Sequence, residues 1–152
     1  MNSNKERNIA NQERGEKGEA LITASLKLLN LWNYKFINAG FGTPFDKLII
    51  PPGGGYAVEV KLRQSHTIPY SGIEENQRKG LDKFMNQVGK DYAYIIGIWK
   101  AQADERAFLI PWHSVRNDVL SGCRGSINML DFPELEKIKG GWDLSRFKAV
   151  KT

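Results

Sequence analysis

The segment GTPFDKLIIPPGGGYAVEVKL, residues 42–62, contains two apolar runs separated by two prolines and three glycines. Turn residues between runs rich in isoleucine, valine and tyrosine predict an antiparallel β-hairpin made of residues 45–50 and 56–62. Because side chains alternate between the two faces of a strand, Glu59 and Lys61 are expected on the same face. Two charges on a strand this apolar are costly unless they are paired or used in chemistry.

Apolar residues that recur every three or four positions predict a helix on each side of this hairpin. The first helix is expected over residues 13–30 and the second over residues 74–88. The other predicted elements are strands at 34–38, 91–99 and 106–110, a loop at 63–72, a short helix at 111–120 and a further helix at 132–139. This order predicts an α/β domain with a mixed central sheet of about five strands, flanked by helices.

The length of 152 residues fits one domain with an ordinary hydrophobic core. Residues 1–12 are polar and lack periodicity, so we expect a flexible arm, followed by a single domain of residues 13–152. Within that domain, residues 13–112 form the expected core, and the remainder forms a helical C-terminal extension. The first residues lack the apolar segment of a secretory signal, and no apolar run is long enough to span a bilayer. We therefore expect a cytoplasmic protein with no membrane partner.

The residue counts restrict the kinds of metal site that this chain can build. One cysteine and two histidines exclude a disulfide framework within the chain and the usual structural zinc sites. Any metal would therefore have to be held by oxygen atoms. The net charge of +5 and the pI of about 9.3 point only weakly to a polyanionic partner.

Glu59, Lys61 and Asp46 form the strongest candidate for a chemical site. The hairpin can bring Asp46 close to Glu59, and two carboxylates with water and phosphate oxygens make the shell that Mg²⁺ prefers, with Mn²⁺ as a substitute. Lys61 would then lie beside the attacking water and stabilise the charge that develops on the phosphorus centre. The structural alternatives are a cross-strand ion pair for Glu59 and Lys61, and a turn or capping role for Asp46.

Two further polar positions have the spacing to join this candidate site. Gln77 lies in line with the apolar face of its helix, so its amide needs a partner, which is either Lys61, a water molecule or the local backbone. Glu16 and Glu19 share one face of the first helix. They are either solvated acids near a helix N-terminus or a source of one more carboxylate, for which the spacing favours Glu19.

These residues resemble the PD-(D/E)xK nuclease superfamily, which has the restriction-endonuclease-like fold, and more narrowly the RecU-type Holliday-junction resolvases. The order of helix, hairpin with Asp and then Glu-x-Lys, and helix with Gln matches the core of that superfamily. The local features similar to RecU-type enzymes are Arg14-Gly15 followed by Glu19, Ile68-Pro69 followed by Gln77, and Phe108-Leu109-Ile110-Pro111. The resemblance covers about residues 13–112.

The resemblance implies a role for each matching residue. Asp46 and Glu59 would bind the metal together with the main-chain carbonyl of Val60, and Lys61 would be the catalytic lysine. Glu19 would be an additional acid and Gln77 the amide near the lysine. The implied protein is a Mg²⁺-dependent DNA endonuclease that acts as a homodimer on branched DNA such as a four-way junction.

The sequence also departs from the family pattern. Phe45 replaces the nominal proline before Asp46, Asn76 occupies a position where the family often has histidine, and Ala57 replaces an acid that often precedes Glu59 by two residues. The stalk that RecU-type enzymes insert into the junction centre has no counterpart here. Archaeal-type resolvases of the same fold also lack it, so junction cleavage stays compatible with the sequence.

Lysines and arginines around the candidate site would neutralise DNA phosphates. The expected DNA-binding residues are the basic residues Arg14, Lys17, Lys47, Arg63, Arg78 and Lys79, together with Thr43, which the resemblance adds because that family carries Ser and Thr in the segment before the Asp. For each of them the structural alternative is an ordinary surface residue. For the whole protein, the alternatives are a less selective nuclease of the same fold, a non-catalytic DNA-binding architectural module, and a structural protein whose Glu59–Lys61 face is an ion-pair ladder.

Overall fold

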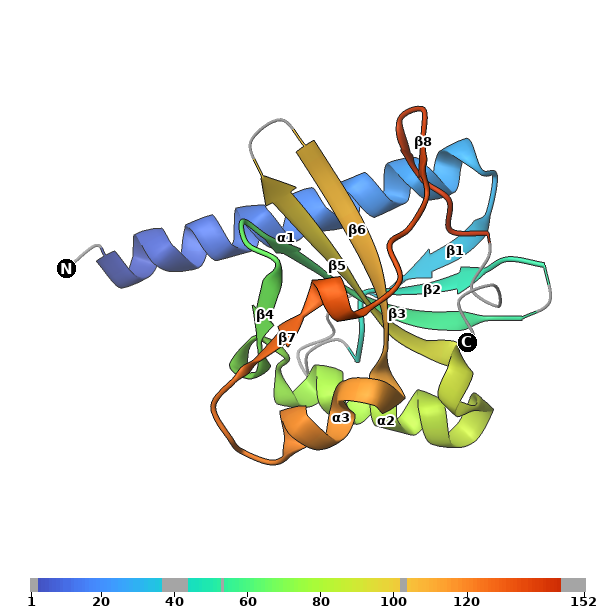
Figure 1. The fold of residues 1–152 in the computed structure, drawn as a ribbon. Helices are drawn as coiled ribbons and strands as arrows, with labels where there is room; N and C mark the ends of the chain where they lie inside the picture. The colour runs from blue at the N-terminus through green and yellow to red at the C-terminus, as the bar shows by residue number, and fades with distance from the viewer. Residues whose placement is uncertain (1–2, 37–43, 53, 102–103, 146–152) are drawn as a thin grey trace.

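A computed structural model describes residues 3–36, 44–52, 54–101 and 104–145, with side chains of the first helix described from residue 15 (Figure 1). Its central sheet has five strands in the order β1-β2-β3-β5-β6. Only β3 and β5 are parallel, and the other neighbouring pairs are antiparallel. The strands are β1 (Trp32–Lys35), β2 (Lys47–Ile50), β3 (Tyr56–Arg63), β5 (Ala93–Ala101) and β6 (Asp104–Pro111). The predicted mixed five-stranded α/β fold is confirmed.

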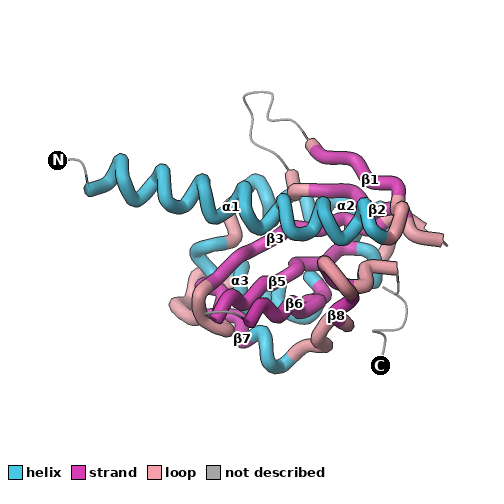
Figure 2. The backbone as a smooth tube through the Cα atoms, turned by 90° about the horizontal axis from the view of Figure 1, so that it is seen from above, coloured by secondary structure: helices cyan, strands magenta, loops and turns pink. Residues whose placement is uncertain are grey.

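Helices cover both faces of this sheet, as the two views in Figures 1 and 2 show. The long helix α1 (Ser3–Leu28) crosses one face, and α2 (Glu75–Val88) with α3 (Trp112–Leu120) covers the other. Each face therefore has its own apolar cluster, one containing Ile22 and Leu26 of α1 and the other containing Leu81 of α2. Within the described residues, no helix is both long and apolar enough to cross a membrane.

Strand β3 lies in the middle of the sheet, and its side chains alternate between the two clusters. Val58, Val60 and Leu62 pack in the cluster beneath α1, whereas Ala57 packs in the cluster on the α2 side. Glu59 and Lys61 share the face of Ala57, as the alternation of a strand requires. The two charged residues therefore face α2 from a central strand and do not lie on an edge strand.

Several element boundaries differ from the sequence expectation. Helix α1 begins at Ser3, so the backbone of residues 3–12, which we expected to be a loose arm, is helical. Helix α1 ends before Asn30, whose left-handed backbone (φ 52°) stops the helix, and β1 then starts at Trp32 instead of residue 34. Residues 37–38 of the predicted first strand lie outside the described residues.

The expected loop at 63–72 and the expected C-terminal helix are both wrong. The loop contains β4 (Thr67–Pro69) and the 3-10 helix η1 (Tyr70–Gly72), and β4 pairs with β7 (Ser126–Asn128) in a small second sheet. A further 3-10 helix, η2 (Lys90–Tyr92), precedes β5. The C-terminal part contains η3 (Met129–Asp131), β8 (Lys137–Ile138) and β9 (Gly141–Trp142).

The free edge of β6 explains why residues 132–136 are extended and not helical. The backbone N–H of Leu109 donates to the carbonyl of Pro133, and the N–H of Leu135 donates to the carbonyl of Ala107. An edge strand leaves backbone donors and acceptors that need partners, and this segment supplies them. A weak helical pattern is thereby overridden by pairing with a strand that is distant in sequence.

Candidate active site

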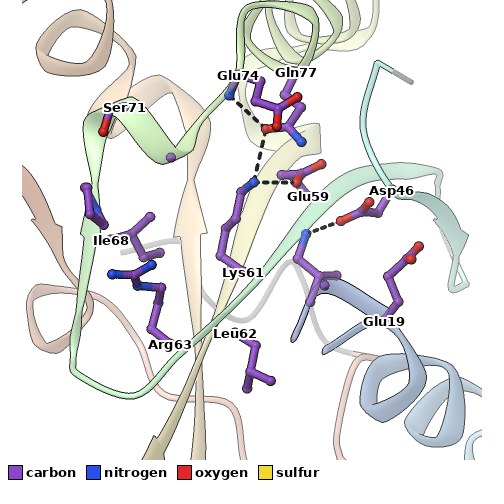
Figure 3. A pocket seen from close by; sticks show the side chains of 14 residues that line it. Glu19, Asp46, Glu59, Lys61, Leu62, Arg63, Ile68, Ser71, Glu74 and Gln77 are labelled. Carbon is purple, nitrogen blue, oxygen red and sulfur yellow. Dashed lines mark hydrogen bonds and ion pairs between the residues drawn. The ribbon is translucent and has the colours of Figure 1, made fainter. Parts of the chain in front are cut away.

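The sequence-predicted acids, lysine and glutamine line one pocket of about 380 Å³ (Figure 3). The residues come from four separate elements, namely α1, the segment before β2, strand β3 and helix α2. The predicted site residues in its lining are Glu19, Asp46, Glu59, Val60, Lys61 and Gln77. Tertiary structure thus gathers side chains that span almost 60 positions of the sequence.

Glu59 and Lys61 form an ion pair on β3, with Lys61 Nζ 3.1 Å from Glu59 Oε2. Glu59 is only 2% exposed. Burial raises the pKa of Glu59 to about 8, the Lys61 ammonium only partly offsets that rise, and the Asp46 carboxylate adds to it. The other oxygen, Glu59 Oε1, is buried and has no hydrogen-bond partner among the described residues. A cation that reached Glu59 Oε1 would stabilise the ionised form of this buried carboxylate.

Asp46 is held against β3 by backbone contacts in both directions. The N–H of Val60 donates to Asp46 Oδ2 at 2.7 Å, and the N–H of Asp46 donates to the carbonyl of Val58 at 3.1 Å. Burial raises the pKa of the Asp46 carboxyl, and the bond from Val60 opposes that rise. The contact with Val60 fixes Asp46 beside Glu59, although the two residues are 13 positions apart.

A glycine on α2 lets the Asp46 segment approach the helix. A Cβ atom added at Gly80 would lie 2.4 Å from the backbone oxygen and from the Cβ of Pro44. Real Cβ atoms do not come so close to backbone atoms, so only glycine permits this contact. Pro44 precedes Asp46 by two residues, and Gly80 therefore contributes to the placement of the acid.

Gln77 has two roles at the first turn of α2. Its Oε1 accepts a hydrogen bond from Lys61 Nζ at 3.1 Å and another from the N–H of Glu74 at 2.9 Å. Glu74 is the N-cap residue, and its side chain accepts from the N–H of Gln77, which completes a reciprocal capping box. The two alternatives for Gln77, a partner for Lys61 and a local cap, therefore both hold.

Glu19 reaches the pocket from α1, and Glu16 is not among the lining residues. Gly18 brings the helix close to β3, because an added Cβ there would lie 3.2 Å from the Cβ of Leu62. Glu19 Oε2 lies 3.5 Å from Lys35 Nζ. Of the two acids that the sequence left open, the structure places Glu19 at the pocket.

The donor set fits an oxygen-bound cation. Among the described residues, no three His, Cys, Asp or Glu side chains are grouped closely enough to hold a metal by themselves. A cation here would take the carboxylates of Asp46 and Glu59 and the main-chain carbonyl of Val60, and water or phosphate oxygens would complete its shell. The buried, unpartnered Glu59 Oε1 is the observation that supports this fit.

The structure places the predicted DNA-binding residues in different environments. Arg63 lines the pocket and donates from Nε to the carbonyl of Thr67. Lys17 is exposed and lies close to Lys100, whose ammonium lowers the pKa of Lys17. Lys79 is exposed and pairs with Glu75 one turn away, at 3.0 Å.

Lys47 and Arg78 differ from the expected surface positions. Lys47 is 3% exposed, and this burial lowers its pKa, so it does not present its charge to DNA as predicted. Its position on β2 opposite the buried Val58 accounts for the burial. Arg78 is half-buried and donates to the carbonyls of Ile73 and Tyr70. The side chain of Arg14 and all of Thr43 lie outside the described residues.

Two polar residues of the pocket were not anticipated from the sequence. Ser71 of η1 and Glu74 line the same pocket, on the side away from Asp46 (Figure 3). Glu74 was harder to find, because the usual capping-box signature has Ser, Thr, Asp or Asn three positions before the Glu or Gln, and here the N-cap residue is a glutamate. Ser71 has no such signature, since its place depends on the pairing of β4 with the distant β7.

Neither a scan against protein-family models nor a search of curated proteins finds a match to this chain. Among solved structures, the fold is similar to that of Archaeoglobus fulgidus Hjc, a Holliday junction resolvase from an archaeal hyperthermophile. The two chains are 16% identical and superpose with a TM-score of 0.54, over 85% of this chain and 98% of the resolvase. The chain thus shares its fold with this resolvase.

Proposed function

We propose that this protein is a Mg²⁺-dependent DNA endonuclease that cleaves branched DNA, with four-way junctions as its preferred substrate. The single observation that carries the proposal is the buried Glu59–Lys61 pair on the central strand, with Asp46 beside it and one Glu59 oxygen left without a partner. A structural ion-pair ladder would not need a second, half-buried acid and an open carboxylate oxygen at the same point.

Each residue has a defined task in this proposal. Asp46, Glu59 and the carbonyl of Val60 would hold the cation, which when bound would polarise the phosphodiester and activate water. Lys61 holds its ammonium at the pocket, where it stabilises the attacking hydroxide and the negative charge of the transition state. Gln77 positions Lys61, because it accepts a hydrogen bond from the ammonium without removing its charge.

Glu19 gives the site a third acid on the side of α1. Burial is the main cause of the raised pKa of Asp46, and the nearby Glu19 carboxylate adds to it, so a cation at this end of the pocket would relieve the repulsion between the two acids. We assign Glu19 as an additional acid that would act on the cation through its charge, since among the described residues it does not group with Asp46 and Glu59 closely enough to be a third ligand.

The choice of substrate rests on the fold and on symmetry. The similar solved structure is a Holliday junction resolvase, and a four-way junction offers two equivalent strands for cutting. Two identical subunits related by a two-fold axis would cut them symmetrically, so we propose a homodimer. Mn²⁺ should replace Mg²⁺, because both ions accept all-oxygen shells.

The test compares cleavage of a labelled four-way junction, a linear duplex and a single strand, each with Mg²⁺, Mn²⁺ or EDTA. Lys61→Ala and Asp46→Asn are the site variants, and Lys90→Ala, at the opposite end of α2, is the control for loss of one positive charge. We expect junction cleavage that needs the divalent ion, survives in the control, and falls at least about 100-fold in both site variants.

Four outcomes would change the proposal. Equal cleavage by the wild type and the site variants would remove the site assignment. Binding of DNA without any metal-dependent cleavage would favour the architectural module. Equal cleavage of all three substrates would leave a nuclease but remove junction selectivity, and sedimentation of a monomer at assay concentration would remove the homodimer.

A further inference from the structure

A second pocket of about 290 Å³ lies next to the candidate active site. Ser71 lines both pockets, so η1 forms the wall between them. The two pockets differ in charge. Three acids of the first pocket are buried or half-buried, whereas no acidic residue is among the described residues that line the second pocket. Its charged side chains are Arg78 and Arg124.

Arg78 is fixed in place without loss of its charge. Its Nε donates to the carbonyl of Ile73 at 2.6 Å, and its Nη2 donates to the carbonyl of Tyr70 at 2.9 Å. Both acceptors are neutral, and within the described part of the chain no carboxylate pairs with this guanidinium. A half-buried, immobilised and uncompensated guanidinium is well suited to bind an anion.

Arg124 is exposed, and the loop that carries it is anchored to the same wall. The N–H of Tyr70 donates to the carbonyl of Gly125 at 3.0 Å, and Pro69 pairs with Ser126 in the β4–β7 sheet. Gly125 also lies directly against the Tyr70 ring, where an added Cβ would approach to 2.7 Å. The backbone on the C-terminal side of Arg124 is therefore held next to Arg78, and none of the described acids pairs with Arg124.

We propose that this second pocket binds a phosphodiester that neighbours the scissile one on the same DNA strand. Arg78 and Arg124 are the residues that bind it. The inference rests on the proposed nuclease function. The acidic pocket takes the cation and the scissile phosphate, and the acid-free pocket across Ser71 takes a neighbouring phosphate of the same backbone. A contact of this kind positions the strand and carries no sequence information.

The test uses Arg124, because Arg78 also supports η1. Binding of the four-way junction is measured by fluorescence anisotropy in EDTA, from about 50 to 200 mM salt, for wild type, Arg124→Ala, Arg124→Lys and Lys90→Ala. We expect Arg124→Ala to weaken binding about tenfold and to reduce the slope of log K against log salt by about 0.9, as loss of one phosphate contact requires. Arg124→Lys should restore the slope, and Lys90→Ala should leave it unchanged.

Cleavage at saturating protein separates this inference from the proposed function. Arg124→Ala should still cut once the DNA is fully bound, and Lys90→Ala should cut at the wild-type rate, whereas Lys61→Ala should not cut. An unchanged slope for Arg124→Ala, or an equal loss in Lys90→Ala, would overturn the second pocket while the nuclease stands. A wild-type protein that binds DNA but cleaves nothing would overturn the nuclease and leave the phosphate pocket, and a protein that does not bind DNA would overturn both.

Discussion

The ammonium of Lys61 on strand β3 and the side-chain oxygen of Gln77 on helix α2 are joined by a hydrogen bond of 3.1 Å. The same oxygen accepts the N–H of Glu74, so the cap of α2 and the orientation of Lys61 depend on one atom. A change in the helix terminus is thereby transmitted directly to the candidate catalytic lysine.

Gln77→Ala should cost stability and activity together. Loss of half of the capping box removes about 1 kcal/mol of the free energy of unfolding, and loss of the Lys61 contact lowers the cleavage rate by about 10–100-fold. Gln77→Glu keeps an acceptor for both partners and should recover most of the stability. Urea unfolding and single-turnover cleavage measure the two effects, and a normal rate in Gln77→Ala would show that the contact does not position Lys61.

Glu59 should make the metal-free protein less stable in alkaline solution. Its pKa rises from about 4.5 to about 8 on folding, so the folded state binds the extra proton between these values. The contribution to stability is complete below about pH 4.5 and is lost as the pH rises through about 8. We expect a decrease of the unfolding free energy on the order of 3–4 kcal/mol between about pH 5 and about pH 8.

Glu59→Gln is the matched variant for this pH effect, since the amide mimics the protonated acid. Urea unfolding in EDTA should show a flatter pH dependence for Glu59→Gln than for the wild type. Added Mg²⁺ should stabilise the wild type most at the alkaline end, where the cation does not compete with the proton, and should have little effect on the variant. Parallel pH curves for the two proteins would contradict the assignment of the buried proton to Glu59.

Gly80→Ala should damage the site from a distance. The new methyl group would collide with Pro44 and displace Asp46. The overpacking should lower the free energy of unfolding by about 1–3 kcal/mol. The displaced acid should reduce the cleavage rate by at least about tenfold. Asn86→Ala, an exposed change to alanine on the same helix, is the control for helix propensity. If Gly80→Ala gained stability and kept full activity, the close contact with Pro44 would not be needed.

Asp82 should matter for stability but not for cleavage. It accepts hydrogen bonds from Trp112 Nε1 at 2.7 Å and from Arg116 Nε and Nη2 at 2.9 and 3.0 Å, and so joins α2 to α3. Asp82→Ala leaves the buried Trp112 without this partner and should cost about 2–3 kcal/mol.

The contribution of Asp82 to stability should also depend on pH. The hydrogen bonds of Arg116 lower the pKa of Asp82, so its stabilising effect is present above the usual value of 3.8 and is lost as the pH falls through the lowered pKa. Thermal unfolding from neutral to acid pH checks this, with the exposed Asp118→Ala as the control. A loss of stability in Asp82→Ala that persisted unchanged in strong acid would argue against the ionised contact.

Local pattern was sufficient for the elements that carry the candidate site. The turn residues between two apolar runs predicted the β2–β3 hairpin, and strand alternation alone put Glu59 and Lys61 on one face. Helical spacing was enough to turn Gln77 inward. These features depend only on residues that are close in sequence. The repeat of two residues in a strand and of 3.6 residues in a helix therefore predicts which face each side chain lies on.

Contacts between distant segments determined the rest. The C-terminal segment is extended because β6 needed backbone partners, and η1 stands between the two pockets because β4 pairs with β7 almost 60 residues later. Lys47 is adjacent in sequence to a site acid, yet in the folded chain it is only 3% exposed. Sequence patterns could place the acids and the lysine on their elements. Only the tertiary structure, through burial and long-range pairing, could show which charges face one another and which are withdrawn from solvent.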